Sequence, residues 1–139
     1  MPTAKIARLL ALVAGSLDFF SGLGFVFCPQ RILPLMRVET PTAEALIYLR
    51  FVGAFVLAVG ACYLFALVRG GLDRLRAALE FTIPFRLSTG AFSATAIGLG
   101  WLSTGWAGVP VVDFALVSLQ LWLLVKLRPG KVEILPPSP

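Results

Sequence analysis

Six polar side chains inside otherwise apolar stretches are the residues of this sequence best suited to chemistry. They are Asp18, Arg50, Arg86, Asp113, Ser93 and Gln120. A carboxylate or a guanidinium within an apolar helix either marks a relay or binding site or forms an ion pair that fixes how helices fit together. The hydroxyl and the amide of this set are expected to form hydrogen bonds between helices. We predict that the six residues form one buried polar seam.

The elements that would carry this seam are four apolar stretches of about 20 residues, the length needed to cross the hydrocarbon core of a bilayer. They run over about 6–28, 47–68, 81–101 and 109–127. We therefore predict an all-α fold, a transmembrane four-helix bundle made by a single membrane domain over residues 1–128. A proline-rich segment, 129–139, is predicted to follow as an extended cytoplasmic tail.

The composition is that of a membrane protein. Of 139 residues, 58% are hydrophobic and only 14% are charged, whereas soluble domains carry about 25% charged residues. So few charged side chains could not cover the surface of a water-soluble globule. The net charge of +5 comes from short basic clusters between the apolar stretches, with no zinc-ligand spacing or RNA-binding signature. We therefore expect the lipid bilayer, and not nucleic acid, as a partner.

Residue types also exclude several kinds of site. The sequence contains no histidine, which removes histidine-ligated haem or zinc and any histidine general base. Cys28 and Cys62 form no CxxC pair, which argues against a disulfide oxidoreductase. We expect neither a metal site nor a catalytic residue and predict no cofactor, although a quinone or a lipid would suit the polar seam.

Basic residues predict the orientation of the chain. Lys5 and Arg8 precede the first stretch, three arginines lie between the second and third, and "KLRPGK" follows the fourth, whereas the opposite side carries Arg31 and Arg37. Because positive segments stay in the cytoplasm, we predict cytoplasmic termini and a multi-pass protein of the inner membrane. Rich use of arginine, alanine, leucine, valine and glycine suits a GC-rich bacterial genome. The alternative, a cleaved signal peptide, is disfavoured because Asp18 interrupts the first stretch and no small-x-small cleavage site follows.

Small residues surround Asp18 on its predicted helix. The face at three-, four- and seven-residue spacing includes Ala14 and Gly22, whereas the opposite face includes Leu9 and Phe20. Small residues mark places where membrane helices approach closely. Asp18 is therefore expected to face protein, and the opposite face is expected to contact lipid.

The charges in the four stretches balance, two acids against two arginines, so each acid is expected to have a partner. Arg50 and Asp113 both lie about one turn inside the predicted outer boundary and match in depth. Asp18 and Arg86 differ in depth by about 10 Å at 1.5 Å per residue, a gap that the length of arginine, a helix tilt or a water would close. Asp18 with Arg50 is nearly as reachable. The seam would then be either structural, with the shallower charges reaching toward the interfaces, or functional.

Aromatic and sulfur-containing residues are predicted to have structural roles. Four of them are expected to anchor the helices at the membrane interfaces: Tyr48, Tyr63, Trp101 and Trp106. Cys62 is predicted to be a small buried apolar residue. It would lie too far from Cys28, at the outer end of the first stretch, to form a disulfide.

Three segments of the sequence resemble the DoxX-like group of small four-helix membrane proteins. They are "FFSGLGFVFCPQRILPLM", "LRFVGAFVLAVGACYLFAL" and "VVDFAL", and the likeness extends over most of residues 6–127. The resemblance implies a four-helix membrane fold. The group includes subunits associated with quinone-linked oxidation and many members without a known role, so the resemblance implies no single activity and brings no catalytic residue to this chain.

Three functions are compatible with these patterns. The leading hypothesis is an accessory or structural subunit of a membrane complex, in contact with other membrane subunits or with further copies of itself. The second is a proton-coupled small-molecule transporter in which Asp18 titrates. The third and least favoured is an enzyme acting on a lipid or isoprenoid, with Asp18, Asp113 or Glu80 as general acid or base, because no two acids share a helix face at catalytic separation.

Overall fold

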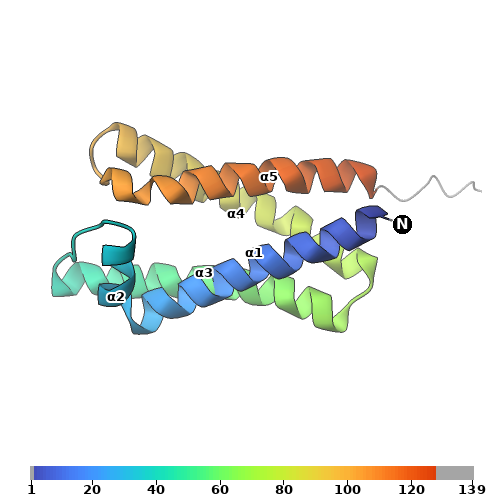
Figure 1. The fold of residues 1–139 in the computed structure, drawn as a ribbon, viewed down its shortest axis with the longest axis horizontal. Helices are drawn as coiled ribbons and strands as arrows, with labels where there is room; N and C mark the ends of the chain where they lie inside the picture. Colours follow the sequence, from blue (N-terminus) through green and yellow to red (C-terminus); the bar gives the residue numbers. More distant parts are fainter. Residues whose placement is uncertain (1, 128–139) are drawn as a thin grey trace, which may run out of the picture.

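The computed structural model describes residues 2–127, and this part of the chain is all α-helical, as predicted. The proline-rich segment 129–139 lies outside the described residues. The elements are α1 (Pro2–Phe27), α2 (Pro29–Leu35), α3 (Ala43–Arg69), α4 (Leu72–Gly98), the 3-10 helix η1 (Thr104–Ala107) and α5 (Gly108–Lys126) (Figure 1).

Three of the long helical segments are long and apolar enough to cross a membrane: Thr3–Phe27, Ala43–Arg69 and Thr104–Lys126. The fourth predicted stretch, 81–101, lies in α4, which begins nine residues earlier, at Leu72, and ends at Gly98. Within the described chain α4 is not among the segments apolar enough to span by composition. The reason is its polar residues, which include Thr82, Arg86 and Ser93 on the buried face and the exposed residues Asp73, Arg74 and Glu80.

Helix α1 packs chiefly on α3, and α4 packs chiefly on α5, so that two helix pairs lie side by side (Figure 1). Glycines allow the first pair to approach closely, because α1 carries Gly15 and Gly22 and α3 carries Gly53 and Gly60 at the same seven-residue spacing. A Cβ atom added at Gly60 would lie 2.7 Å from the Gly15 carbonyl oxygen. The small-residue face predicted for α1 is therefore a helix–helix contact, as expected from the sequence.

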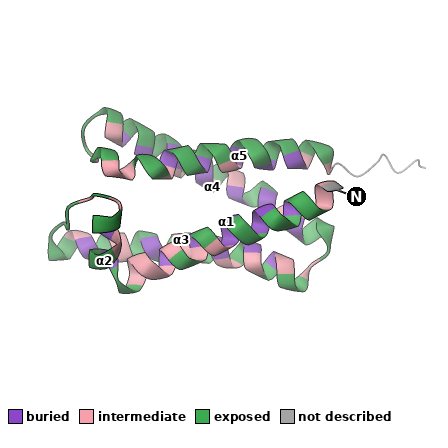
Figure 2. Ribbon diagram, in the orientation of Figure 1, coloured by how far each residue is buried: buried purple, intermediate pink, exposed green. Residues whose placement is uncertain are grey.

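Buried residues occur along all four long helices (Figure 2), and a cluster of buried apolar side chains lies toward the end where α1 begins, α5 ends and α3 turns into α4. It is formed by alanines, leucines and one tyrosine from all four long helices: Ala7, Leu10, Ala11, Ala14, Tyr63, Leu75, Leu79 and Leu123. The other side of α1 is exposed, with Leu9 at 60% and Phe20 at 67% of full accessibility. These exposed side chains are those predicted to contact lipid.

The opposite end of the molecule is closed by the two short helices α2 and η1 (Figure 1). The ring of Trp106 stacks on Phe25 with centroids 6.0 Å apart. Gly105 packs against the backbone of Met36 and Arg37, where a Cβ atom would lie 2.5 Å from the Met36 carbonyl oxygen. These contacts join α1 and the segment after α2 to the start of α5, and so connect the two helix pairs at this end.

Candidate functional site

Arg86 of α4 lies at the centre of the polar seam and is only 3% exposed. Its guanidinium donates from one terminal nitrogen to Asp113 Oδ1 of α5 at 2.9 Å and from the other to Asp18 Oδ2 of α1. The two carboxylate side chains are themselves 12% and 11% exposed, for Asp18 and Asp113 respectively. One buried guanidinium thus forms ion pairs with acids from two different helices.

Hydroxyl groups of α4 complete the surroundings of Asp113. Thr89 donates to its second carboxylate oxygen, with Oγ1 and Oδ2 2.6 Å apart. Ser93, one turn further along the same buried face, donates to the Thr89 backbone carbonyl at 2.6 Å. The hydrogen bond of Ser93 is therefore within α4, and the prediction that it bonds to another helix is wrong. A serine in a helix can satisfy its hydroxyl on the carbonyl four residues earlier, and Ser93 does so.

A second group of hydrogen bonds centres on the Tyr63 hydroxyl of α3. This oxygen accepts from Arg86 Nε at 3.5 Å and from the Gln120 side-chain amide of α5, and it lies 2.6 Å from Thr82 Oγ1 of α4. Gln120 also donates to Thr82 at 3.0 Å, and Thr82 donates to the Ala78 carbonyl at 2.8 Å. With Asp18 of α1, the seam therefore contains a polar side chain from each long helix. The predicted interhelical role of Gln120 is confirmed.

The side-chain carbonyl of Gln120 is the exception in this network, because it forms no hydrogen bond within the described chain. Because the amide nitrogen is directed at Tyr63 and Thr82, the oxygen points the other way, and within the described chain Oε1 is buried without a hydrogen-bond partner. A buried polar atom without a partner costs about 1–3 kcal/mol. The seam is therefore extensive but not fully satisfied.

Arg50 does not belong to the seam, and its predicted pairing with Asp113 is wrong. Its guanidinium donates to the Val26 backbone carbonyl near the end of α1, at 2.5 Å, and the residue is half-buried. Arg50 and Asp113 were expected to pair because they lie at a similar predicted depth in the membrane. However, α3, which carries Arg50, packs chiefly on α1 and not on α5, which carries Asp113. Helix α1 runs obliquely across α3 (Figure 1), and the Asp18–Arg86 pair, for which a depth gap was expected, forms directly. The seam consequently holds two acids and one arginine, and the predicted charge balance is lost.

Three residues of the hydrogen-bond network were not among the six predicted seam residues: Tyr63, Thr82 and Thr89, of which Thr89 lies three residues after Arg86 on the same helix. Tyr63, assigned to the membrane interface, is fully buried, and Thr82 was not singled out. Thr82 lies four residues before Arg86 and shares its face, and Tyr63 follows Gly60 by three residues on the glycine-bearing face of α3. Helical spacing from the residues already identified would have found both. Cys62 was predicted to be buried, but it is exposed, because it lies one position away from that buried face.

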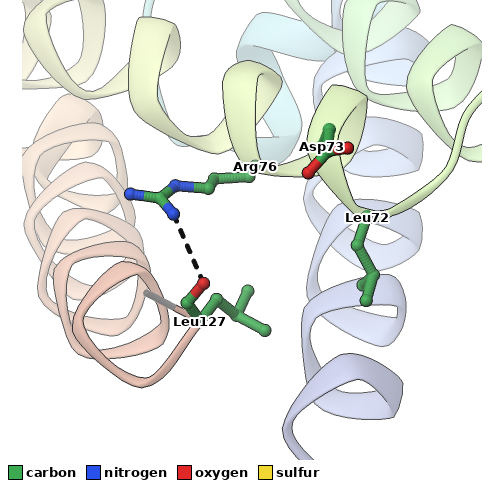
Figure 3. Close-up of a pocket in the computed structure, with 4 residues that line it drawn as sticks. All are labelled: Leu72, Asp73, Arg76 and Leu127. Carbon is green, nitrogen blue, oxygen red and sulfur yellow. Dashed lines mark hydrogen bonds between the residues drawn. The ribbon is translucent and has the colours of Figure 1, made fainter. Parts of the chain in front are cut away.

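Two hollows lie outside the seam. The first, of about 210 Å³, lies where α4 begins and α5 ends and is lined by Leu72, Asp73, Arg76 and Leu127 (Figure 3). Arg76 there donates to the Leu127 carbonyl at 3.3 Å and joins the two helices.

The second hollow is an open apolar groove between α3 and α4 of about 380 Å³, called here the α3–α4 groove. Its walls are mainly alanine, cysteine and phenylalanine side chains, including Phe55, Ala58, Cys62, Ala78, Phe81 and Phe85. Thr82 also lines it, and this residue belongs to the seam as well, so the groove lies directly beside the seam.

Within the described residues, no group of three histidine, cysteine or acidic side chains is placed to hold a metal ion. No protein-family model, curated protein or solved structure matches the sequence or the fold.

Proposed function

We propose that the chain is a four-span protein of the inner membrane, a transmembrane four-helix bundle with both termini on the cytoplasmic side. Three apolar helices and a fourth of similar length, α4, support this placement. Helix α4 keeps Arg86 and Thr82 buried against the other helices, which would shield these groups from lipid. Arg69 and Arg74 lie at the end of the molecule where α1 begins and α5 ends, which fits a cytoplasmic surface.

Labelling of the native cysteines tests this topology. Cys28 lies at the end of α1 and Cys62 lies inside α3, and both side chains are exposed in the isolated chain. A membrane-impermeant maleimide added to intact spheroplasts is expected to label Cys28 from the outside. Cys62 should react only after the membrane is dissolved, and Cys28→Ser is the matched control. Labelling of Cys62 from outside, or of Cys28 only from the cytoplasmic side, would overturn the topology.

Within the membrane, the proposed role is that of an accessory subunit or partner of a larger complex, and the resemblance to DoxX-like proteins favours a quinone-linked one. The observation that carries this role is the convergence of Asp18, Tyr63, Arg86 and Asp113, one from each long helix, in a single buried network. Such a network fixes the relative positions of the helices. A rigid bundle with exposed apolar faces suits a subunit that packs against other membrane helices.

Purification from the native membrane in a mild detergent tests the role. The tagged chain is expected to elute as a particle much larger than its own 14.9 kDa, with other subunits in fixed ratio by native mass spectrometry. A parallel preparation in a harsh detergent, which separates subunits, provides the control. Recovery as a lone monomer from every mild detergent and from native nanodiscs would refute the proposal.

A second candidate function, proton-coupled transport of a small molecule with Asp18 as the titrating group, is favoured by the charge count of the seam. Two carboxylates share one guanidinium, so the buried group carries one excess negative charge that a single proton would neutralise. Infrared difference spectroscopy of the reconstituted protein should then show the carbonyl band of a protonated carboxyl, and Asp18→Asn should remove it. A band that is absent, or that disappears only in Asp113→Asn, would rule out this function for Asp18.

A further inference from the structure

We propose that the α3–α4 groove binds one acyl chain of an anionic phospholipid whose phosphate lies between Arg69 and Arg74. This inference rests on the membrane placement proposed above. It adds a specific lipid, a specific headgroup charge and the residues that recognise both. The groove walls are apolar and open to the side, and the two arginines stand at one end of it.

Helical spacing aligns each arginine with one wall of the groove. Arg69 follows Cys62 by seven residues on α3, and Arg74 precedes Ala78 by four residues on α4, so each arginine lies on the face that lines the groove. Both arginines are exposed. The Arg74 side chain crosses the turn between the helices and donates to the Arg69 carbonyl at 3.3 Å. The Arg74 guanidinium therefore lies at the turn where Arg69 ends α3, beyond the end of the groove formed by Cys62 and Ala78.

The distance from the two arginines to the far end of the groove is similar to the thickness of one leaflet of a bilayer. At 1.5 Å per residue, Phe55 lies about 21 Å below Arg69, and Phe85 lies about 16 Å below Arg74. Half of a hydrocarbon core is about 15 Å. A phosphate at the level of the arginines would therefore place its acyl chain beside the alanines and phenylalanines of the groove and end it near the mid-plane.

Charge selects an anionic headgroup at this turn and not at the neighbouring hollow. A guanidinium binds phosphate through paired hydrogen bonds, and two of them at one turn favour a net negative lipid over a zwitterionic one. The hollow beside α5 is different, because Asp73 lines it together with Arg76 and would repel an anion (Figure 3), whereas within the described residues no acidic side chain lines the α3–α4 groove. The lipid is therefore assigned to the α3–α4 groove.

Native mass spectrometry of the purified full chain, with added lipids of defined structure, tests the assignment. Dioleoyl phosphatidylglycerol is expected to bind about thirtyfold more tightly than dioleoyl phosphatidylcholine, because each basic residue near a headgroup contributes about 1 kcal/mol and 1.4 kcal/mol is tenfold. Dihexanoyl phosphatidylglycerol, whose chains cannot reach the lower groove, should bind more weakly than the dioleoyl lipid. Equal binding of the two headgroups, or of the two chain lengths, by the unmodified protein would overturn the proposal.

Two sets of variants test the headgroup contact and the acyl-chain contact of the lipid separately. Arg69→Gln with Arg74→Gln should abolish the preference for phosphatidylglycerol, whereas Arg8→Gln, which removes an exposed arginine at the same end of the molecule, should leave it intact. Ala58→Phe, which fills the groove, should weaken both dioleoyl lipids equally. A preference that survives the double substitution would show that the arginines do not bind the phosphate. Cysteine labelling reports the topology separately, so a wrong membrane placement and a wrong lipid site give different results.

Discussion

Replacing Arg86 by leucine would leave two buried carboxylates without their shared cation. Asp18 and Asp113 are each about one-tenth exposed, and each makes its ion pair with this single guanidinium. Removing one partner of a buried ion pair costs about 3–5 kcal/mol, because the remaining charge stays buried without compensation. Since two pairs are lost together, we expect the upper part of that range, about 5 kcal/mol, which is at least a third of the stability of about 5–15 kcal/mol that is typical of a native protein.

The charge count predicts an asymmetry among the three residues. Asp113→Asn would keep one full ion pair to Arg86, and the Thr89 hydroxyl could accept from the new amide in place of donating. We therefore expect a loss of only about 1 kcal/mol for this substitution and for Asp18→Asn, as for a single hydrogen bond. The two combined would strand Arg86 and should cost about 3–5 kcal/mol.

The assay is reversible unfolding in mixed micelles of a mild detergent and sodium dodecyl sulfate, followed by circular dichroism. Arg50→Leu is the matched control, because Arg50 is also an arginine of a long helix but donates to one backbone carbonyl and lies outside the seam. Replacing all of Asp18, Arg86 and Asp113 by leucine should restore most of the lost stability, since no charge is left unpaired. An Arg86→Leu protein no less stable than the Arg50→Leu protein would refute this account of the seam.

Two further substitutions test the packing and the hydrogen bonds. Gly60→Ala should destabilise the protein by about 1–3 kcal/mol through overpacking, because the new Cβ would lie 2.8 Å from Phe19 Cα. Gly98→Ala is the control and should not destabilise the protein, because the space around Gly98 is open. Equal unfolding midpoints for the two variants would contradict the close α1–α3 contact. Tyr63→Phe should lower the free energy of unfolding by about 1–3 kcal/mol, since donors of the seam lose their acceptor. Tyr48→Phe is the control and should leave the stability almost unchanged, because Tyr48 is exposed. A Tyr63→Phe protein as stable as the unmodified one would show that the hydroxyl is not needed.

The helices and the inward face of α1 could be predicted from the sequence because both depend on local patterns. Apolar length sets where helices form, and the small residues around Asp18 identify the face that meets protein. The prediction was weakest for α4, where polar groups on the buried face lower the hydropathy of a helix that is nevertheless as long as α3.

The partners of the charged residues could not be predicted in the same way. Spacing along one helix says which residues share a face, but the choice between Arg50 and Arg86 depends on which helices pack together and how they cross. The glycines that bring α1 against α3 decide that arrangement, and with it the isolation of Arg50 from Asp113. Tyr63 was misassigned for a related reason, since an aromatic residue with a hydroxyl suits either an interface or a buried network.

The separation of Asp18 and Arg86 along the chain has a consequence for biosynthesis. The two residues are 68 positions apart, so a ribosome releases the acid well before its counter-charge has been made. In the proposed membrane placement, the first helix would enter the bilayer during that interval with an uncompensated carboxyl, at a cost of roughly 2.5–3.5 kcal/mol on insertion scales. Helices α1 and α3, whose glycines allow them to pack closely, would then pair first and remain at the insertion machinery until α4 and α5 have been synthesised.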